Sequence, residues 1–434
     1  MEELRGKKLL LTGATLFSMF FGAGNLIFPP FLGAQAGVNT WPMAMLGMAL
    51  SAIALPVLGV VAAARAGGLE RLAGRVGRRF AFLFTILVYL SIGPCLAIPR
   101  TASTSFEMAV PPFLGGGLES WTGLLQLVYS LVFFGLAFLE ALRPEKLTQR
   151  LGKFLCPCLL LLIVVVFAAC LLHPVGTYGP ATGAFQVQPL AQGFIDGYQT
   201  MDTIAALNFG IVVAINIRAF GITDQRAVTR GTIRAGWIAG GMFLVVYSML
   251  AHVGALSGGA FPGSSNGTEV LTRLVPALFG PWGSVILALI FVIACFNTCV
   301  GLISSCSQYF HTQFPRLSYR AWAAFFSAVS VLISNAGLDL ILRFSVPVLG
   351  IIYPVAIVLI LLSFFQRWLE GMAYVYPVSI AVTGLFSVLY ALRDLGAPLD
   401  FLAAVPLSAQ GLGWVLPSLA GVAVGLALSA LRRR

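Results

Sequence analysis

Apolar residues along the chain gather into long runs that short polar segments separate. Each run is about 20 residues long, which is enough to cross a bilayer as an α-helix. The pattern predicts twelve transmembrane helices, at residues 9–34, 42–64, 80–109, 121–141, 154–173, 189–217, 235–257, 281–310, 321–336, 338–365, 372–392 and 412–431. We therefore predict an all-α integral membrane protein with a single transmembrane domain over residues 1–434.

Small and polar residues interrupt two of these predicted helices. Gly22-Ala23-Gly24-Asn25 interrupts the first, and the run Gly197-Tyr198-Gln199-Thr200-Met201-Asp202 interrupts the sixth. Irregular backbone at membrane depth persists only where it lines a cavity inside protein. Paired broken helices in two inverted halves indicate the binding site of a secondary transporter. The pattern thus predicts a five-plus-five inverted repeat over residues 9–173 and 189–365, followed by two additional helices at 372–431.

The first break has groups that suit a charged ligand. Where a helix restarts, its unpaired N–H groups and positive dipole favour a carboxylate, and the carbonyls before the break suit a small cation. The alternative is a flexible kink or a tight helix contact through small residues.

The second break contains an ionisable residue, Asp202, which is costly at membrane depth and is therefore a functional hypothesis by default. The alternative is a structural partner for a buried cation, and Arg100 in the third predicted helix is the obvious one. Arg100 shares a helix face with Glu107, and we assign this pair a structural or gating role. The alternative for Arg100 is a place in the gate and the substrate path.

Composition supports the membrane assignment, because 59% of the residues are hydrophobic and only 9% are charged. The net charge of +11 does not indicate nucleic-acid binding. Most lysines and arginines fall in the loops on the side of the two termini, which predicts cytoplasmic N- and C-termini by the positive-inside rule. The sequence leaves the oligomeric state open.

Several motifs of enzymes and pumps are missing from the sequence. It has no Gly-x-x-x-x-Gly-Lys phosphate loop and no His-Glu-x-x-His zinc motif, and its three histidines lie near the ends of predicted helices. We therefore predict a carrier that is not an enzyme, needs no cofactor and is driven by an ion gradient. A channel is disfavoured, because no ring-forming repeat is visible.

Three separated motifs resemble those of the bacterial branched-chain amino acid:cation symporters, the BrnQ-type family. They are Phe21-Gly22-Ala23-Gly24-Asn25-Leu26-Ile27-Phe28-Pro29-Pro30, then Ile92-Gly93-Pro94 with Ala97-Ile98-Pro99-Arg100-Thr101-Ala102, then Gly197-Tyr198 with Thr200-Met201-Asp202. The resemblance implies uptake of leucine, isoleucine and valine, driven by sodium or in some members by protons, across the bacterial cell (inner) membrane. It also implies the leucine-transporter fold. The alternative is a symporter of the same fold for another neutral amino acid or small organic substrate.

The resemblance also implies roles for individual residues. The substrate carboxylate would lie on the amides of Ala23 and Gly24. The full set of expected substrate-binding residues is Gly22, Ala23, Gly24, Asn25, Tyr198, Thr200, Met201 and Asp202. The expected sodium ligands are Ser18, Phe21, Ala294, Asn297 and Thr298. Asn297 departs from the family pattern, which favours two hydroxyl residues at the last two positions. Helix packing is the alternative role for Asn297 and Thr298.

Overall fold

The computed structural model describes residues 4–114 and 119–433, and every regular element in these ranges is a helix. Ten helical stretches of the described chain have the length and hydropathy to cross a membrane, and α15 (Tyr319–Ser334) is a shorter apolar helix. The prediction of an all-helical chain with many membrane-length helices is therefore confirmed. The count of twelve and the inverted repeat stay predictions.

The helices follow the apolar runs of the sequence closely. Their bounds are α1 Gly6–Phe20, α2 Ala23–Ala36, α3 Met45–Ala49, α4 Leu55–Ala66, α5 Leu69–Ala73, α6 Arg78–Leu90, α7 Ala97–Ala109, α8 Thr122–Ala141, α9 Cys156–Leu172 and α10 Pro189–Tyr198. The second half has α11 Asp202–Ala219, α12 Gln225–Ala260, α13 Gly267–Phe279, α14 Pro281–Gln313, α15, α16 Leu338–Phe364, α17 Gln366–Leu369, α18 Val375–Asp394 and α19 Val415–Arg433.

The first predicted helix is divided where the sequence predicts, but the break is shorter. Only Phe21 and Gly22 lie between α1 and α2, and Gly22 has extended backbone angles (φ −121°, ψ −154°). The side-chain oxygen of Asn25 accepts a hydrogen bond from the Gly22 amide at 3.1 Å. This cap starts α2 early, so Ala23, Gly24 and Asn25 form its first turn and are not part of the break.

The sixth predicted helix is also divided, again over fewer residues than predicted. Residues 199–201 are not helical, and Met201 has a positive φ of 68°. Gly197 and Tyr198 still belong to α10, and Asp202 is the first residue of α11. A third irregularity lies at Ser91–Cys95 between α6 and α7, where Gly93 has ψ −129°. Pro94 and Pro99 lack an amide hydrogen, which is why the helix changes direction there.

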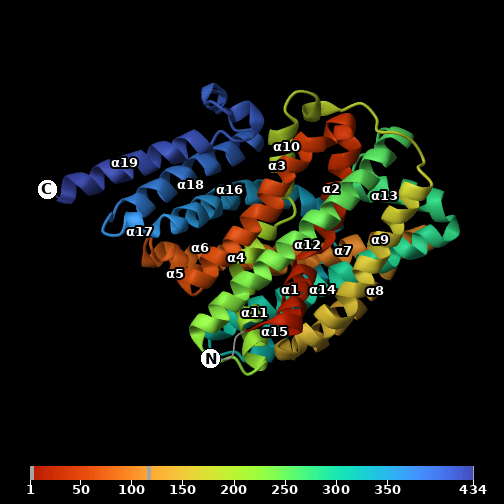
Figure 1. The fold of residues 1–434 in the computed structure, drawn as a ribbon, viewed down its shortest axis with the longest axis horizontal. Coiled ribbons are helices and arrows are strands. Elements are labelled where there is room, and N and C mark those ends of the chain that lie inside the picture. Colours follow the sequence, from red (N-terminus) through yellow and green to blue (C-terminus); the bar gives the residue numbers. More distant parts are fainter. Residues whose placement is uncertain (1–3, 115–118, 434) are drawn as a thin grey trace.

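Helices α1, α2 and α11 of the two broken pairs pack on the long helix α12, whereas α10 packs on α3 (Figure 1). A Cβ added to Gly33 of α2 would lie 2.0 Å from the Ala251 carbonyl oxygen, and one added to Gly254 of α12 would lie 1.9 Å from that of Pro30. The backbones of α2 and α12 therefore touch directly, as small residues allow. Helices α16, α18 and α19 lie side by side at one side of the molecule, away from α1 and α2 (Figure 1).

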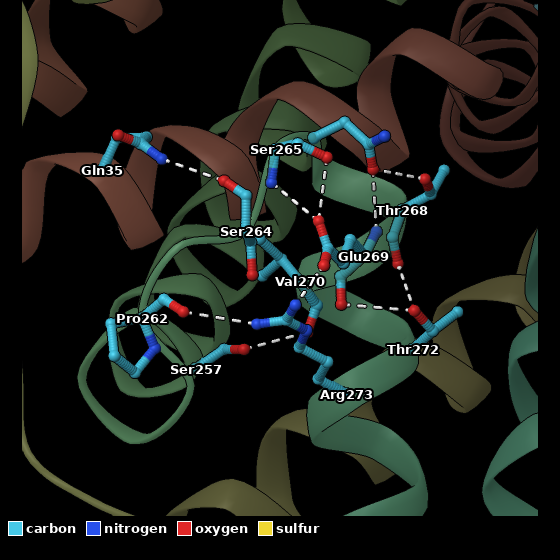
Figure 2. A network of polar contacts seen from close by, with 11 residues as sticks. Gln35, Ser257, Pro262, Ser264, Ser265, Thr268, Glu269, Val270, Thr272 and Arg273 are labelled. Carbon is cyan, nitrogen blue, oxygen red and sulfur yellow. Dashed lines mark hydrogen bonds and ion pairs between the residues drawn. The ribbon is translucent and has the colours of Figure 1, made fainter.

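A polar network fixes the short helix α13 against the end of α2 (Figure 2). Gln35 of α2 donates to the Ser264 carbonyl at 3.2 Å, and Ser257 donates to the Val270 carbonyl at 2.9 Å. The Glu269 carboxylate accepts from the Ser265 amide at 2.7 Å and pairs with Arg273. The network holds the loop before α13 closed over this end of the bundle.

Candidate functional site

A small cavity of about 20 Å³ lies where the two broken helices meet. The lining residues come from α1, α2, α7, α11, α14 and the two irregular segments at 91–95 and 199–201. They are Met19, Phe20, Gly22, Ala23, Gly24, Asn25, Ile92, Ala97, Arg100, Thr101, Thr200, Met201, Asp202, Ala205, Phe209, Thr298 and Leu302. The structure thus brings together residues of both predicted breaks, as a shared binding site requires.

Asn25 connects the two broken helices. Its side-chain nitrogen donates to the Asp202 carboxylate at 2.5 Å and to the Tyr247 hydroxyl at 2.7 Å. Its side-chain oxygen accepts from the Gly22 amide. All three groups are buried, so Asn25 fixes the start of α2 and the start of α11 relative to each other.

Tyr247 of α12 completes this cluster, because its hydroxyl also donates to Asp202 at 3.3 Å. The sequence reasoning missed Tyr247. The one sequence signal for Tyr247 as a site residue is its amphipathic phenol in the middle of the apolar run at 235–257.

Arg100 of α7 is 4% exposed and contacts the second break. Its guanidinium donates to the carbonyls of Gln199 at 2.9 Å and Thr200 at 3.5 Å. Within the described ranges no carboxylate lies within 4 Å of it, so Asp202 acts on Arg100 only at longer range and the structural partnership between the two stays a prediction. Glu107 lies two turns further along α7, is half-buried and does not line the cavity.

The glycines of the first break allow close approach by other helices. A Cβ on Gly22 would lie 2.7 Å from the Thr298 hydroxyl oxygen. One on Gly24 would lie 3.0 Å from both the Arg100 guanidinium and the Thr200 Cα. The backbone at the start of α2 is therefore in direct reach of α14, Arg100 and the second break.

The second break divides its predicted residues between two places. Thr200, Met201 and Asp202 line the cavity, and the Thr200 hydroxyl donates to the Gly197 carbonyl at 2.8 Å. Tyr198 does not line the cavity. Its ring stacks on Tyr353 of α16 with centroids 4.6 Å apart, which places it towards the side of the bundle.

The expected sodium ligands lie where α1 meets α14. The Asn297 side-chain nitrogen donates to the Ser18 hydroxyl at 2.7 Å, and Phe21 and Ala294 are fully buried. The side-chain oxygens of Asn297 and Thr298 are buried and have no hydrogen-bond partner in the described part of the chain. Two other hydroxyls of α14, those of Ser307 and Thr312, donate to the carbonyls four residues earlier, whereas the Ser304 hydroxyl is also buried without a partner.

Two wider cavities open at the end of the molecule that carries Arg71, Arg78 and Arg218. The larger, of about 600 Å³, ends at the stacked rings of Tyr89 and Tyr309, whose centroids are 4.0 Å apart. Ile92 and Leu302, within two helical turns of these tyrosines, line the central cavity. The tyrosine stack therefore lies between the basic end and the site.

Comparison with known proteins identifies relatives over nearly the whole chain. The family model described as branched-chain amino acid transport protein matches residues 5–432. The branched-chain amino acid transport system 2 carrier protein of Pseudomonas aeruginosa is 43% identical, with 96% of this chain and 95% of the relative covered. The branched-chain amino acid permease BraB of Bacillus subtilis is 39% identical, with 99% and 97% covered.

Among solved structures, the nucleobase-cation-symport-1 family transporter Mhp1, in a closed conformation with bromovinylhydantoin bound, superposes with a TM-score of 0.61. The alignment covers 96% of this chain and 91% of Mhp1 at 13% identity. This similarity shows a shared transporter fold.

Proposed function

The chain belongs to the branched-chain amino acid transport protein family, and on this basis we propose that it imports leucine, isoleucine and valine by symport with sodium. Its relatives are named as carriers and permeases, so the chain is a membrane transporter and not an enzyme. The proposal adds the coupling ion, the individual substrates and the mechanism. Alternating access would expose the cavity between the broken helices first to one side of the membrane and then to the other.

The pair of unpartnered oxygens on α14 carries the sodium assignment. A helical threonine ordinarily donates back to the carbonyl four residues earlier, but Thr298 does not, and the Asn297 oxygen beside it is equally free. Buried polar atoms without partners are rare and costly. A small cation coordinated by these oxygens, the Ala294 carbonyl and groups of α1 would satisfy them, and hard oxygen ligands suit sodium.

The cavity lining supports a branched aliphatic substrate. Apart from the polar groups at the two breaks and the side chains of Arg100, Thr101 and Thr298, it consists of apolar residues such as Ile92, Phe209 and Leu302. An apolar pocket distinguishes substrates that differ by one methylene by only about 1–3 kcal/mol. Leucine, isoleucine and valine should therefore compete for the site.

The positive-inside bias supports a bacterial cell membrane orientation with both termini in the cytoplasm. In this orientation the two wider cavities face the cytoplasm, and the network around α13 closes the outside. One sodium ion moving inward through 100 mV supplies about 2.3 kcal/mol, which corresponds to about forty-fold accumulation of substrate.

Proton coupling is the competing proposal, and the buried Asp202 carboxylate favours it. A proton on Asp202 would neutralise a charge that the site otherwise keeps inside the bundle. In that case uptake would follow the pH gradient and would not require sodium. A transporter of the same fold for another neutral amino acid is the remaining alternative.

Uptake of labelled leucine into proteoliposomes tests both the ion and the substrate. We expect accumulation with an inward sodium gradient, none with an equal potassium gradient, and competition by isoleucine and valine. Accumulation driven by a pH gradient alone in sodium-free buffer would show that protons, and not sodium, are the coupling ion. Competition by unrelated neutral amino acids with no preference for branched ones would overturn the substrate assignment.

A further inference from the structure

Arg100 presents a buried positive charge to the cavity, and no carboxylate of the described residues pairs with it within 4 Å. Its side chain is 4% exposed and lines the cavity. Only two hydrogen bonds hold it, both to the neutral carbonyls of Gln199 and Thr200, and a guanidinium has five N–H groups. A buried charge with neutral partners alone is unfavourable, and an anion in the cavity would relieve this cost.

The position of the guanidinium fits a ligand at the start of α2. Nη2 of Arg100 lies 3.0 Å from the place where a Cβ on Gly24 would stand. The first turn of α2 lines the same cavity, and helix N-termini favour anions. An arginine binds a carboxylate through two parallel hydrogen bonds, which fixes the orientation as well as the affinity.

Asp202 presents the opposite charge to the same cavity. Its hydrogen-bond partners Asn25 and Tyr247 are neutral donors, so this carboxylate also lacks a counter-ion within 4 Å in the part of the chain that the structure describes. The remaining lining is largely apolar. One fixed cation, one fixed anion and an apolar surface match the three parts of a zwitterionic aliphatic amino acid.

We propose that Arg100 is the receptor of the substrate carboxylate and that Asp202 receives the substrate ammonium group. Arg100 thereby acts in substrate binding and not only in joining α7 to the second break. This inference rests on the proposed function, because it concerns how the same cavity recognises its amino acid.

Substrate analogues that each lack one charge test the assignment. Leucinamide lacks the carboxylate and 4-methylpentanoate lacks the ammonium group. Competition against labelled leucine would be measured with purified protein in sodium buffer at pH 6.5, where an α-amino group is charged. The variants are Arg100→Gln, Arg100→Lys and Asp202→Asn, and Arg273→Gln outside the cavity is the control for loss of a positive charge.

In the wild type and the control we expect leucine to bind about ten- to hundredfold more tightly than either analogue, because each loses a charged hydrogen bond. In Arg100→Gln, the affinity for leucine should fall to the affinity for leucinamide, which itself should stay unchanged. In Arg100→Lys, the affinity for leucine should lie between those of the wild type and Arg100→Gln. Asp202→Asn should bind leucine and 4-methylpentanoate with equal affinity and should still bind leucine more tightly than leucinamide. This crossed pattern does not depend on how much protein is folded, since each comparison uses one sample.

Retention of the leucine preference over leucinamide in Arg100→Gln would overturn the inference while leaving the transporter assignment intact. An equal loss of leucine and leucinamide binding in both arginine variants would also overturn it, because that is the result of a purely structural role. Absence of leucine binding to the wild type would overturn the proposed function itself.

Discussion

The side-chain amide of Asn25 donates to the carboxylate of Asp202 at 2.5 Å across 177 residues of sequence. This single bond joins the first turn of α2 to the first turn of α11, so the two broken helices share one polar centre. If α2 moves relative to α11 during transport, this hydrogen bond must break; if the bond persists, the two helices must move together.

Asn25→Ala should therefore weaken leucine binding by about five- to hundredfold. The substitution removes the donor of Asp202 and of Tyr247, and a buried polar group left without a partner costs roughly 1–3 kcal/mol. Asn25→Asp should weaken leucine binding further, because it places a second carboxylate against Asp202. The measurement is leucine binding together with the thermal midpoint of the purified protein. Asn216→Ala, also a buried asparagine but near Pro144, is the control, and equal effects at both positions would contradict the prediction.

Gly24→Ala tests how closely the helices must approach at the site. The added Cβ would lie 3.0 Å from the Arg100 guanidinium and the Thr200 Cα, so one of them must shift. A displacement of reacting or binding groups by about 1 Å costs on the order of a hundredfold, and we expect uptake to fall about tenfold or more. Gly135→Ala in α8 has open space around the new methyl group and should keep normal uptake. Wild-type uptake by Gly24→Ala would show that the contact is not needed.

Thr298→Val tests the sodium ligands without a change of shape. The variant keeps the volume of the side chain and removes the unpartnered hydroxyl. We expect the sodium concentration for half-maximal leucine uptake to rise about tenfold, in line with the loss of one hydrogen bond to a charged group. Ser307→Ala in the same helix removes a hydroxyl that is bonded to Ile303 and should leave the sodium dependence unchanged. An unaltered sodium requirement in Thr298→Val would remove this residue from the ion site.

The sequence predicts the location of the two breaks well, because glycine and polar residues in the middle of an apolar run weaken a transmembrane helix. It does not predict where each helix resumes. Successive helical residues point about 100° apart. Tyr198, predicted to lie in the break, is the last residue of α10, and its ring stacks on Tyr353 and does not line the cavity. Tyr247 escaped prediction for a related reason, since its contact with Asp202 depends on how α12 is rotated and not on any local pattern.

Tyr309→Ala should open a path from the basic end towards the site. Its ring stacks on Tyr89 at an interplanar angle of 3°, and the buried Cys306 thiol donates to the Tyr89 carbonyl at 3.6 Å. Removing the Tyr309 ring should make Cys306 react with a small water-soluble thiol reagent, measured by mass spectrometry of its peptide. Tyr178→Ala, at the other end of the bundle, should leave Cys306 unreactive. An unreactive Cys306 in both variants would mean that other residues close this path.

Acidification should loosen the loop before α13. Hydrogen bonds from the Ser265 amide and hydroxyl lower the pKa of the Glu269 carboxyl, and the neighbouring Arg273 lowers the pKa further. A carboxyl whose pKa is lower in the folded state stabilises the fold above its ordinary pKa of about 4.3, and this contribution disappears as the pH falls through the lowered value. Hydrogen exchange of residues 258–273 should therefore accelerate as the pH decreases below about 4.3, after correction for the intrinsic rate. Glu269→Gln should show fast exchange already at neutral pH and no further acceleration in acid. A wild-type loop whose corrected exchange is independent of pH would show that Glu269 does not hold it.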